Sequence, residues 1–331
     1  MSVSENENQS QTDVRPSLEE LKPSPVDGLK SLDLDGIVDY IKSGKAKNII
    51  IMQGAGISCG AGIPDFRTPG TGLYHNLESM GLPSPESIFD INYFQEHPEP
   101  FYLFAKNMLP GQYKPTLAHH LPILFDRHEM LLRVYTQNVD ELEYAAGVPY
   151  EKICHAHGSY YTGHCLDCDK KFSLDDYRES ILEMDVFRCD ECYGLVKPDV
   201  IFFNEQLPLD FFLQTLDDFP KCDLLIVIGT SLQVNPFAGM IGKVPEECPR
   251  ILFNIEKSAY YPEIAIITKD EGDDQYKLVE VSNNQGRFKF DHQLNRRDVF
   301  VKGDCQVTIK DFIEKLGWSE ELKQIMSPQK H

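Results

Sequence analysis

Six short apolar runs, each ending in a polar or glycine-containing cluster, constrain the fold of this chain most strongly. Continuous apolar runs are typical of parallel strands that are covered on both faces. In open parallel sheets, ligands bind beyond the carboxyl ends of the strands, so the clusters mark the expected site. The runs are NIIIMQ before GAG, LLRVY before TQN, KIC before HAHG, LLIVI before GTS, RILF before NIE, and VFV before KGD.

Two further segments interrupt this series of predicted strands. Residues 69–115 are rich in Pro, Gly, Tyr and Phe, which favours loops and short helices, and residues 160–205 carry paired cysteines. We interpret both as insertions that together form a smaller lobe. Before the first strand, Leu34, Ile37, Val38 and Ile41 recur at helical spacing and predict a short amphipathic helix.

The composition restricts the partners and the compartment. A formal net charge of −20 repels phosphate backbones, so general nucleic-acid binding is not expected, whereas Lys/Arg-rich protein segments would be attracted. The acidity could equally serve solubility alone. No apolar stretch reaches the roughly 18 residues that a membrane span needs. The first residues do not resemble a secretory signal, and nine cysteines in such a chain favour metal binding in the cytosol or nucleus over a disulfide framework.

The two C-x2-C units are the strongest single motif. Cys165 and Cys168 form the first unit, Cys189 and Cys192 form the second, and the spacing between the units is that of a zinc ribbon. Four thiolates on two tight turns can surround a tetrahedral zinc ion and leave no open position, which predicts a structural ion. The alternatives are four unrelated buried cysteines or a redox C-x-x-C pair.

A glycine loop follows the first predicted strand. A strand that leads into such a turn can bring backbone N–H groups up to a pyrophosphate. The match to G-x-G-x-x-G is weak by itself, because Gly60 comes one position late and no acid follows a second strand at the usual distance. An ordinary turn is the alternative. The loop Gly54-Ala55-Gly56-Ile57-Ser58 is followed, however, by an acid, an aromatic ring and a guanidinium, in Asp65, Phe66 and Arg67.

Taken together, the motifs resemble those of the sirtuins, which are NAD-dependent protein deacylases. The pattern is most similar to the class I, mainly cytoplasmic eukaryotic type, and the matching segments span nearly everything from about residue 30 to 320 in family order. They are GAGISCGAGIPDFR (54–67), TQNVDELE (136–143), HAHGS (155–159), both cysteine pairs, KPDVIFF (197–203), GTSLQVNPF (229–237) and FNIEK (253–257).

The resemblance implies an α/β fold in which a Rossmann-like parallel-sheet domain carries a smaller inserted lobe with a zinc ribbon and helices. It also implies NAD as co-substrate and one structural Zn²⁺. The expected divisions are a disordered N-terminal tail over 1–28, the Rossmann-like domain over 29–68, 116–159 and 206–320, the small lobe over 69–115 and 160–205, and a C-terminal tail over 321–331.

For the cofactor, the resemblance implies contacts at the end of nearly every predicted strand. Individually, some of these residues have simpler explanations, since Asp140 could only cap a helix, Phe66 could be core, and Arg67 could hold its own loop. The implied contacts are Gly54, Ala55, Gly56, Ile57, Ser58 and Cys59 with the pyrophosphate; Asp65, Phe66 and Arg67 over the nicotinamide ribose; Gln137, Asn138, Val139 and Asp140 in the ribose and nicotinamide pocket; Gly229, Thr230 and Ser231 with phosphate and ribose; Asn254, Ile255 and Glu256 with the adenosine ribose; and Cys305 near the adenine.

For the chemistry, the resemblance implies cleavage of the nicotinamide–ribose bond and transfer of the acyl group from lysine to ADP-ribose. His157 matches the catalytic histidine, and Asn138 is grouped with it as catalytic. A neutral imidazole suits the activation of a ribose hydroxyl because its pKa lies near 7. In contrast, His155, His164 and Cys154 are expected to be packing or surface residues.

The acylated peptide is expected to add as a strand between two segments of the chain, chiefly through main-chain hydrogen bonds. No Tyr/Arg pair stands where acid-acyl sirtuins place one, so neutral acyl groups from acetyl to long chain are expected. Asn204 replaces a common glycine, which puts the peptide preference in doubt, and Cys59 could make NAD binding sensitive to oxidation. The docking residues are Val200, Ile201, Phe202, Phe203, Asn204 and Glu205 on one side, and Gln233, Val234, Asn235 and Pro236 on the other.

Two other functions compatible with the same motifs are mono-ADP-ribosyl transfer, and a catalytically silent module that binds NAD or ADP-ribose around a structural zinc. The presence of His157 and Asn138 favours an enzyme.

Overall fold

The computed structural model describes residues 22–65, 81–260, 266–269, 276–279 and 286–327. Within these ranges, the six predicted strands form one parallel sheet in the order β11-β8-β7-β1-β2-β3. This confirms the predicted fold class. The strands are β1 (Ile49–Gln53), β2 (Leu131–Thr136), β3 (Ile153–His155), β7 (Leu224–Ile228), β8 (Arg250–Asn254) and β11 (Asp298–Lys302).

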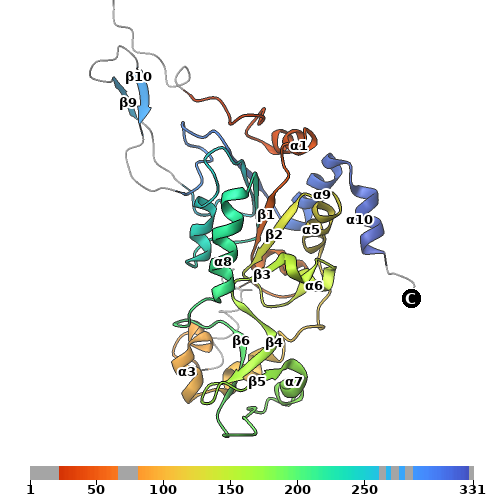
Figure 1. The fold of residues 1–331 in the computed structure, drawn as a ribbon, viewed down its shortest axis with the longest axis vertical. Helices are drawn as coiled ribbons and strands as arrows, with labels where there is room; N and C mark the ends of the chain where they lie inside the picture. The colour runs from red at the N-terminus through yellow and green to blue at the C-terminus, as the bar shows by residue number, and fades with distance from the viewer. Residues whose placement is uncertain (1–21, 66–80, 261–265, 270–275, 280–285, 328–331) are drawn as a thin grey trace, which may run out of the picture.

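Both faces of this sheet are covered, which explains why its strands are apolar throughout rather than alternating. Ile49 and Ile51 of β1 belong to one core cluster, with α1, α5, α9 and α10, whereas Ile50 and Met52 belong to another, with α8. Figure 1 shows these two groups of helices on opposite sides of the sheet. The helices are α1 (Leu34–Lys42), α5 (Leu117–Arg127), α8 (Leu209–Asp218), α9 (Cys305–Leu316) and α10 (Ser319–Met326).

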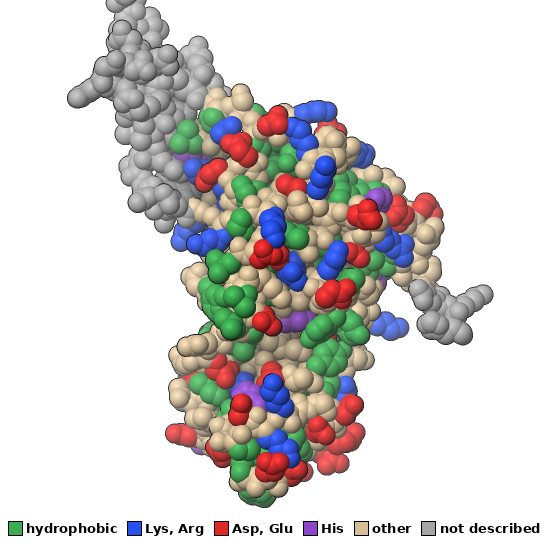
Figure 2. Space-filling model, in the orientation of Figure 1, with side chains coloured by type: hydrophobic (Ala, Val, Ile, Leu, Met, Phe, Trp, Pro, Cys, Tyr) green, Lys and Arg blue, Asp and Glu red, His purple; other side chains and the backbone are tan. Residues whose placement is uncertain are grey.

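The two predicted insertions meet in a small lobe with its own core, which lies at the lower end of the molecule in Figures 1 and 2. Phe94 and Phe101 from the first insertion pack on Phe202 from the second, with ring centroids 5.6 and 4.8 Å apart. The elements are η4 (Pro85–Phe89), α3 (Ile91–Glu96) and α4 (Glu99–Ala105), with β4 (Gly158–Cys165), β5 (Lys171–Ser173), α7 (Leu174–Glu183) and β6 (Val196–Val200). A three-stranded sheet in the order β5-β4-β6 completes the lobe.

Ordered structure extends into both ranges that were expected to be tails. Val26 is buried, and its N–H donates to the carbonyl of Arg296. The helix α10 runs to Met326, and its Leu322 lies in the core. The antiparallel pair β9 (Ile266–Lys269) and β10 (Tyr276–Val279) stands apart from both other sheets. Among the described helices, none combines the length and the apolar character that crossing a membrane requires.

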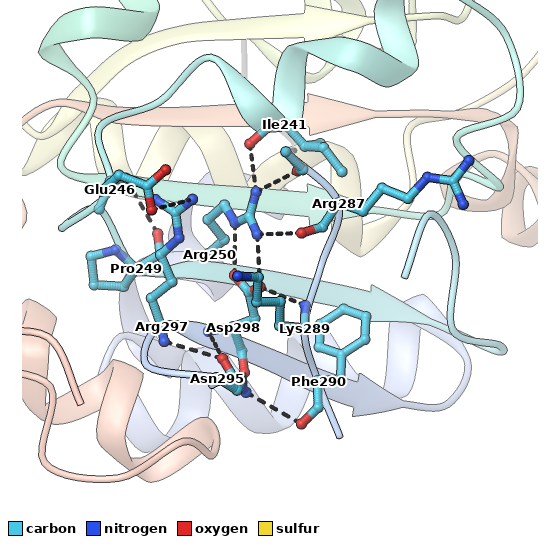
Figure 3. A network of polar contacts seen from close by, with 12 residues as sticks. Ile241, Glu246, Pro249, Arg250, Arg287, Lys289, Phe290, Asn295, Arg297 and Asp298 are labelled. Atoms are coloured by element: carbon cyan, nitrogen blue, oxygen red, sulfur yellow. Dashed lines mark hydrogen bonds and ion pairs between the residues drawn. The ribbon is translucent and has the colours of Figure 1, made fainter. Parts of the chain in front are cut away.

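A buried ion pair joins β8 to β11 at the end of the sheet away from the predicted site (Figure 3). Arg250 is 1% exposed, and its Nε and Nη2 donate to the two carboxylate oxygens of Asp298, each at 2.7 Å. Its remaining N–H groups donate to the carbonyls of Ile241, Gly286 and Arg287 at 2.8–2.9 Å. The guanidinium therefore has a partner for every donor and anchors residues 286–298 to the sheet.

We expect Asp298→Ala to lower the free energy of unfolding by about 3–5 kcal/mol, because it leaves the Arg250 charge buried without its counter-ion. Urea denaturation followed by circular dichroism measures the change. The control is Asp217→Ala, which removes an exposed ion pair with Lys221 and should cost less than about 1 kcal/mol. Equal losses in the two variants would contradict the role given to the buried pair.

Candidate active site

The carboxyl ends of the parallel strands bring the predicted residues to one edge of the sheet. Backbone hydrogen bonds continue across this edge beyond the strands themselves. The N–H of Gln137 donates to Gln53, that of Gly54 donates to Ile228, and that of Gly229 donates to Phe253, at 3.0–3.1 Å. The segments that follow β1, β2, β7 and β8 are therefore held side by side, as a site at this edge requires.

The glycine loop packs directly on the turn after β7. A Cβ on Gly56 would come within 2.9 Å of the Gly229 backbone, and Gly229 has a left-handed φ of +62°. Only glycine permits this approach without displacement. However, the N–H groups of Gly54, Gly56, Ile57 and Ser58 all donate to backbone carbonyls. The loop thus offers a close, Cβ-free surface at Gly54 and Gly56, while these four amides are already used to hold it in place.

Gln137 has a donor that fits an absent ligand. Its Oε1 accepts a hydrogen bond from Thr230 Oγ1 at 3.0 Å, whereas its buried Nε2 has no partner among the described residues. Nearby, Asn254 Nδ2 donates to the carbonyl of Thr230 at 3.2 Å and so joins the ends of β7 and β8. The Gln137 Nε2 group is thus a buried donor between two glycine turns that still needs an acceptor. The hydroxyl and phosphate oxygens of NAD are such acceptors, so the residues present fit this cofactor.

A buried network fixes Asn138 beneath the loop. Its Nδ2 donates to the Gly54 carbonyl and to Ser58 Oγ, each at 3.3 Å. Ser58 Oγ in turn donates to Asp140 Oδ2 at 2.7 Å and lies 3.3 Å from His119 Nε2. Asp140 Oδ1 also accepts from the N–H of Leu142 at 3.0 Å, at the start of α6 (Leu142–Ala146). Asp140 therefore accepts from the first N–H of this helix, although Glu141 is the N-cap residue, and it belongs to the network as well.

His119, which no motif in the sequence indicates, also belongs to this network. Thr116 N–H donates to His119 Nδ1 at 3.0 Å, in a capping box at the start of α5. The accepting Nδ1 places the proton on Nε2, which faces Ser58. Burial lowers the pKa of His119 to about 3, so the ring is neutral. The only signal in the sequence is a threonine with a histidine three residues later, which is too common to identify a site.

His157 lies where the chain leaves the large sheet for the small lobe, directly before β4. Its Nδ1 is 3.0 Å from the carbonyl of Gln137, which can only accept, so Nδ1 carries the proton. This leaves Nε2 as the unprotonated nitrogen. Burial lowers the pKa of His157, and the hydrogen bond to Gln137 opposes this. The ring is therefore neutral at pH 7 and able to accept a proton.

The four cysteines of the two C-x2-C units converge in the small lobe. All four sulfur atoms lie within 4.8 Å of one another, with Cys165 and Cys192 3.4 Å apart and Cys168 and Cys189 3.7 Å apart. Tetrahedral zinc with Zn–S bonds of about 2.3 Å requires separations of roughly 3.8 Å between sulfurs. Lys170 contacts both Asp190 and Glu191 and ties the two turns together. The residues fit a structural zinc ion with four protein ligands.

Comparison with known proteins agrees with this geometry. A family model described as the Sir2 family matches residues 54–236. The chain is 44% identical over 300 residues to the NAD-dependent protein deacetylase sirtuin-2 of Danio rerio, which covers 90% of this chain and 76% of the relative. The chain belongs to the Sir2 family, the sirtuins.

Two further relatives show how much of each protein the similarity covers. This sirtuin is 44% identical over 301 residues to the NAD-dependent deacetylase sir2A of Dictyostelium discoideum, but covers only 54% of that protein. It is 37% identical over 301 residues to the NAD-dependent protein deacetylase sirtuin-3 of Mus musculus, covering 91% of this chain and 81% of the relative. Each alignment therefore spans both lobes.

The first predicted docking segment of this sirtuin joins His157 to the small lobe. Ile201 N–H donates to the carbonyl of His157 at 2.9 Å. Val200 and Phe202 are buried in the small-lobe core, so only Ile201 and Phe203 have surface to offer an apolar lysine stem. Behind them, buried Lys197 pairs with Glu205 at 3.1 Å, and Glu205 accepts from the N–H of Phe202 at 2.6 Å.

Asn204 takes the left-handed φ of +70° that glycine would adopt easily. Its Nδ2 donates to Asp90 Oδ2 at 2.8 Å, and Phe203 N–H donates to the carbonyl of Phe89 at 2.7 Å. The substitution thus adds a side-chain link between the docking segment and the start of α3.

The remaining predicted residues differ in their exposure. Ile255 is 62% exposed, and Cys305 is buried at the start of α9. Burial raises the pKa of Cys305 to about 12, so this thiol is unreactive at neutral pH. Phe66 and Arg67 lie outside the described residues. The others are Cys59, Ser231, Gln233, Asn235 and Glu256, which are exposed, and Ala55, Asp65, Val139, Val234 and Pro236, which are partly exposed.

We expect Asn204→Gly to raise the KM for an acetyl-lysine peptide about two- to fivefold at unchanged kcat, because the docking segment is then less preorganised. Steady-state kinetics with peptide varied at saturating NAD measures this. Asn204→Ala is the matched control. It removes the same hydrogen bond but, unlike glycine, still places a side chain at a positive φ, where the backbone is strained. A KM equal to that of the unmodified chain in both variants would contradict the proposed link.

Proposed function

We propose that this chain is an NAD-dependent protein-lysine deacetylase, which removes neutral acyl groups from acetyl to longer chains. The observation that carries the proposal is the placement of His157, a neutral imidazole with Nε2 unprotonated, between the cofactor edge and the predicted docking segment. The relatives named NAD-dependent deacetylases support the same activity. Those names also imply protein substrates.

NAD, when bound, supplies a leaving nicotinamide and the ribose that receives the acyl group. In this proposal, the glycine turns and Gln137 hold the cofactor, and Asn138 orients its nicotinamide ribose. His157 Nε2 removes a proton from a ribose hydroxyl, while the Gln137 carbonyl holds Nδ1–H. The peptide lies between 200–205 and 233–236 and brings its acyl-lysine to the same place.

The decisive experiment follows nicotinamide release from NAD with and without an acetyl-lysine peptide. We expect one nicotinamide for each lysine freed, and neither product when either reactant is omitted. Deacetylation without NAD would overturn the proposal. Label transferred from NAD to protein would instead identify a mono-ADP-ribosyltransferase, and binding without turnover would identify a silent module.

The same purified chain can be tested on succinyl and long-chain acyl peptides. We expect little turnover of succinyl-lysine, because the sequence offers no Tyr/Arg pair for a carboxylate. A cytoplasmic and nuclear location is a proposal that rests on the resemblance to the class I type, and imaging of the tagged chain tests it.

A further inference from the structure

Glu143 is an acid on α6 to which the proposed reaction assigns no role. Its side chain is 0% exposed, and neither carboxyl oxygen has a hydrogen-bond partner among the residues that the structure describes. Polar groups are seldom buried in this way, because the lost hydration is not replaced. The surroundings of Glu143 must therefore account for its burial.

A second buried carboxyl group, that of Asp140, lies beside it. Oxygen atoms of Asp140 and Glu143 and a ring nitrogen of His119 all lie within 4.8 Å of one another. The third acid nearby is Glu141, which is also buried. The neighbouring bases, His119 and His120 of α5, have pKa values lowered by burial, so neither supplies a positive charge at neutral pH.

The same three side chains do not form a metal site in this arrangement. His119 accepts the Thr116 N–H at Nδ1, so its Nε2 carries a proton and faces Ser58. A metal ion would need that nitrogen unprotonated. Without a cation, two carboxylates this close in a buried site cannot both be charged.

We propose that Asp140 and Glu143 share a single proton, held on Glu143, which leaves Asp140 ionised as the acceptor for Ser58. Hydrogen bonds from Ser58 at 2.7 Å and from the Leu142 N–H at 3.0 Å favour the charged form of Asp140. No comparable bond reaches Glu143 from any part of the chain that the structure describes. The proton therefore belongs on Glu143.

The pKa values agree with this assignment. Burial, and then the charge of Asp140, raises the pKa of Glu143 to about 8, although the Thr136 hydroxyl lies near enough to oppose the rise. Burial also raises the pKa of Asp140, but the hydrogen bonds from Ser58 and Leu142 counteract it.

Glu143 is thus a positioning residue for the proposed reaction, since it acts only through other side chains. Asp140 holds the Ser58 hydroxyl, and Ser58 accepts a hydrogen bond from Asn138. The shared proton keeps the hydrogen bonds between Asn138, Ser58 and Asp140 intact beneath the cofactor loop. Its loss at high pH would place a second negative charge next to Asp140.

Infrared difference spectroscopy between the unmodified chain and Glu143→Gln tests the proton directly. At pH 7 we expect the carbonyl band of a protonated carboxylic acid in the unmodified chain, and its loss in Glu143→Gln. Raising the pH through about 8 should remove the band. Burial also raises the pKa of Glu141 to about 7, so the control Glu141→Gln removes that acid's own contribution to the band and must retain the Glu143 signal. Loss of carboxylate bands, instead of the acid band, in Glu143→Gln would overturn the proposal.

The pH dependence of stability supplies a second readout. A carboxyl whose pKa rises from 4.5 to about 8 on folding stabilises the fold below pH 4.5, and this contribution is lost as the pH rises to about 8. Glutamine does not titrate. The denaturation midpoint of Glu143→Gln relative to the unmodified chain should therefore rise between about pH 5 and 8 and then level off. Parallel pH profiles would contradict a raised pKa.

The kinetic role rests on the proposed deacetylase function. At pH 7, Glu143→Gln should keep the KM for NAD within about twofold, whereas Glu143→Ala, which removes the shared proton from beside Asp140, should raise it about fivefold. Equal effects of the two substitutions would contradict the positioning role. If the unmodified chain shows no deacetylation, the proposed function fails, while the infrared result still decides the proton assignment.

Discussion

Replacing His157 with alanine should lower kcat for deacetylation by about 10² to 10⁴-fold, because the reaction then lacks its general base. The binding of NAD should change little, since the glycine turns and Gln137 remain. Titration calorimetry with NAD, alongside steady-state kinetics, separates the two effects. Loss of NAD binding together with turnover would show that His157 has a structural role instead.

His164→Ala is the matched control for this prediction. His164 belongs to the same cluster in the sequence, but its Nδ1 pairs with Asp199 at 2.6 Å on β4 and β6, and the ring takes no part in the proposed site. We expect its kcat to stay within about twofold of the unmodified chain. A control variant as impaired as His157→Ala would contradict the assignment.

Burial lowers the pKa of His157, so its ring is already neutral at pH 7. Titration of His157 should therefore cause no change in the turnover of the unmodified chain between pH 7 and 8.

Cys189→Ala should release the zinc ion and unfold the small lobe. Structural zinc contributes on the order of 10 kcal/mol to the folding of small zinc domains, which exceeds what the core of such a lobe supplies by itself. Cys165 and Cys189 are part of the same core cluster as Phe202. Deacetylation should therefore be lost with the docking segment, whereas NAD binding to the separately packed large sheet should survive in part.

Metal analysis and limited proteolysis measure these effects. We expect about one zinc ion per unmodified chain, less in Cys189→Ala, and new cleavage within 160–205. Cys222→Ala is the control, because Cys222 is equally buried but packs in the core below α8. It should retain its zinc. A stable, active, metal-free Cys189→Ala protein would contradict the structural role of the ion.

Several features could be predicted because each depends on residues that are close in the sequence. An apolar run of five residues is enough to indicate a strand buried on both faces, and the polar cluster after it marks the ligand edge. In the same way, the two C-x2-C units carry their own ligand geometry. All six strands and the convergence of the four cysteines follow the prediction.

Other features depend on contacts between residues far apart in the chain. In the sequence, Val200 and Phe202 are as apolar as Ile201 and Phe203. Only the packing of the small lobe shows that Val200 and Phe202 belong to its core while the other two reach the surface. The partner of Asn204 is Asp90, 114 positions away, which no local pattern indicates. Gly54 and Gly56 likewise donate their amides to the carbonyls of Ile228 and Gly229, which only folding brings near.

The sequence by itself therefore indicated the strands, the polar clusters at their ligand edge, the four cysteines of the zinc site and His157 as the candidate base. Tertiary structure decided the protonation of that site. The Gln137 carbonyl selects which nitrogen of His157 is free, and the hydrogen bonds that Ser58 and Leu142 donate to Asp140 determine which of the two buried carboxyls keeps its proton. Protonation depends on dielectric surroundings and on hydrogen-bond partners in space, and neither is a property of neighbouring residues in the chain.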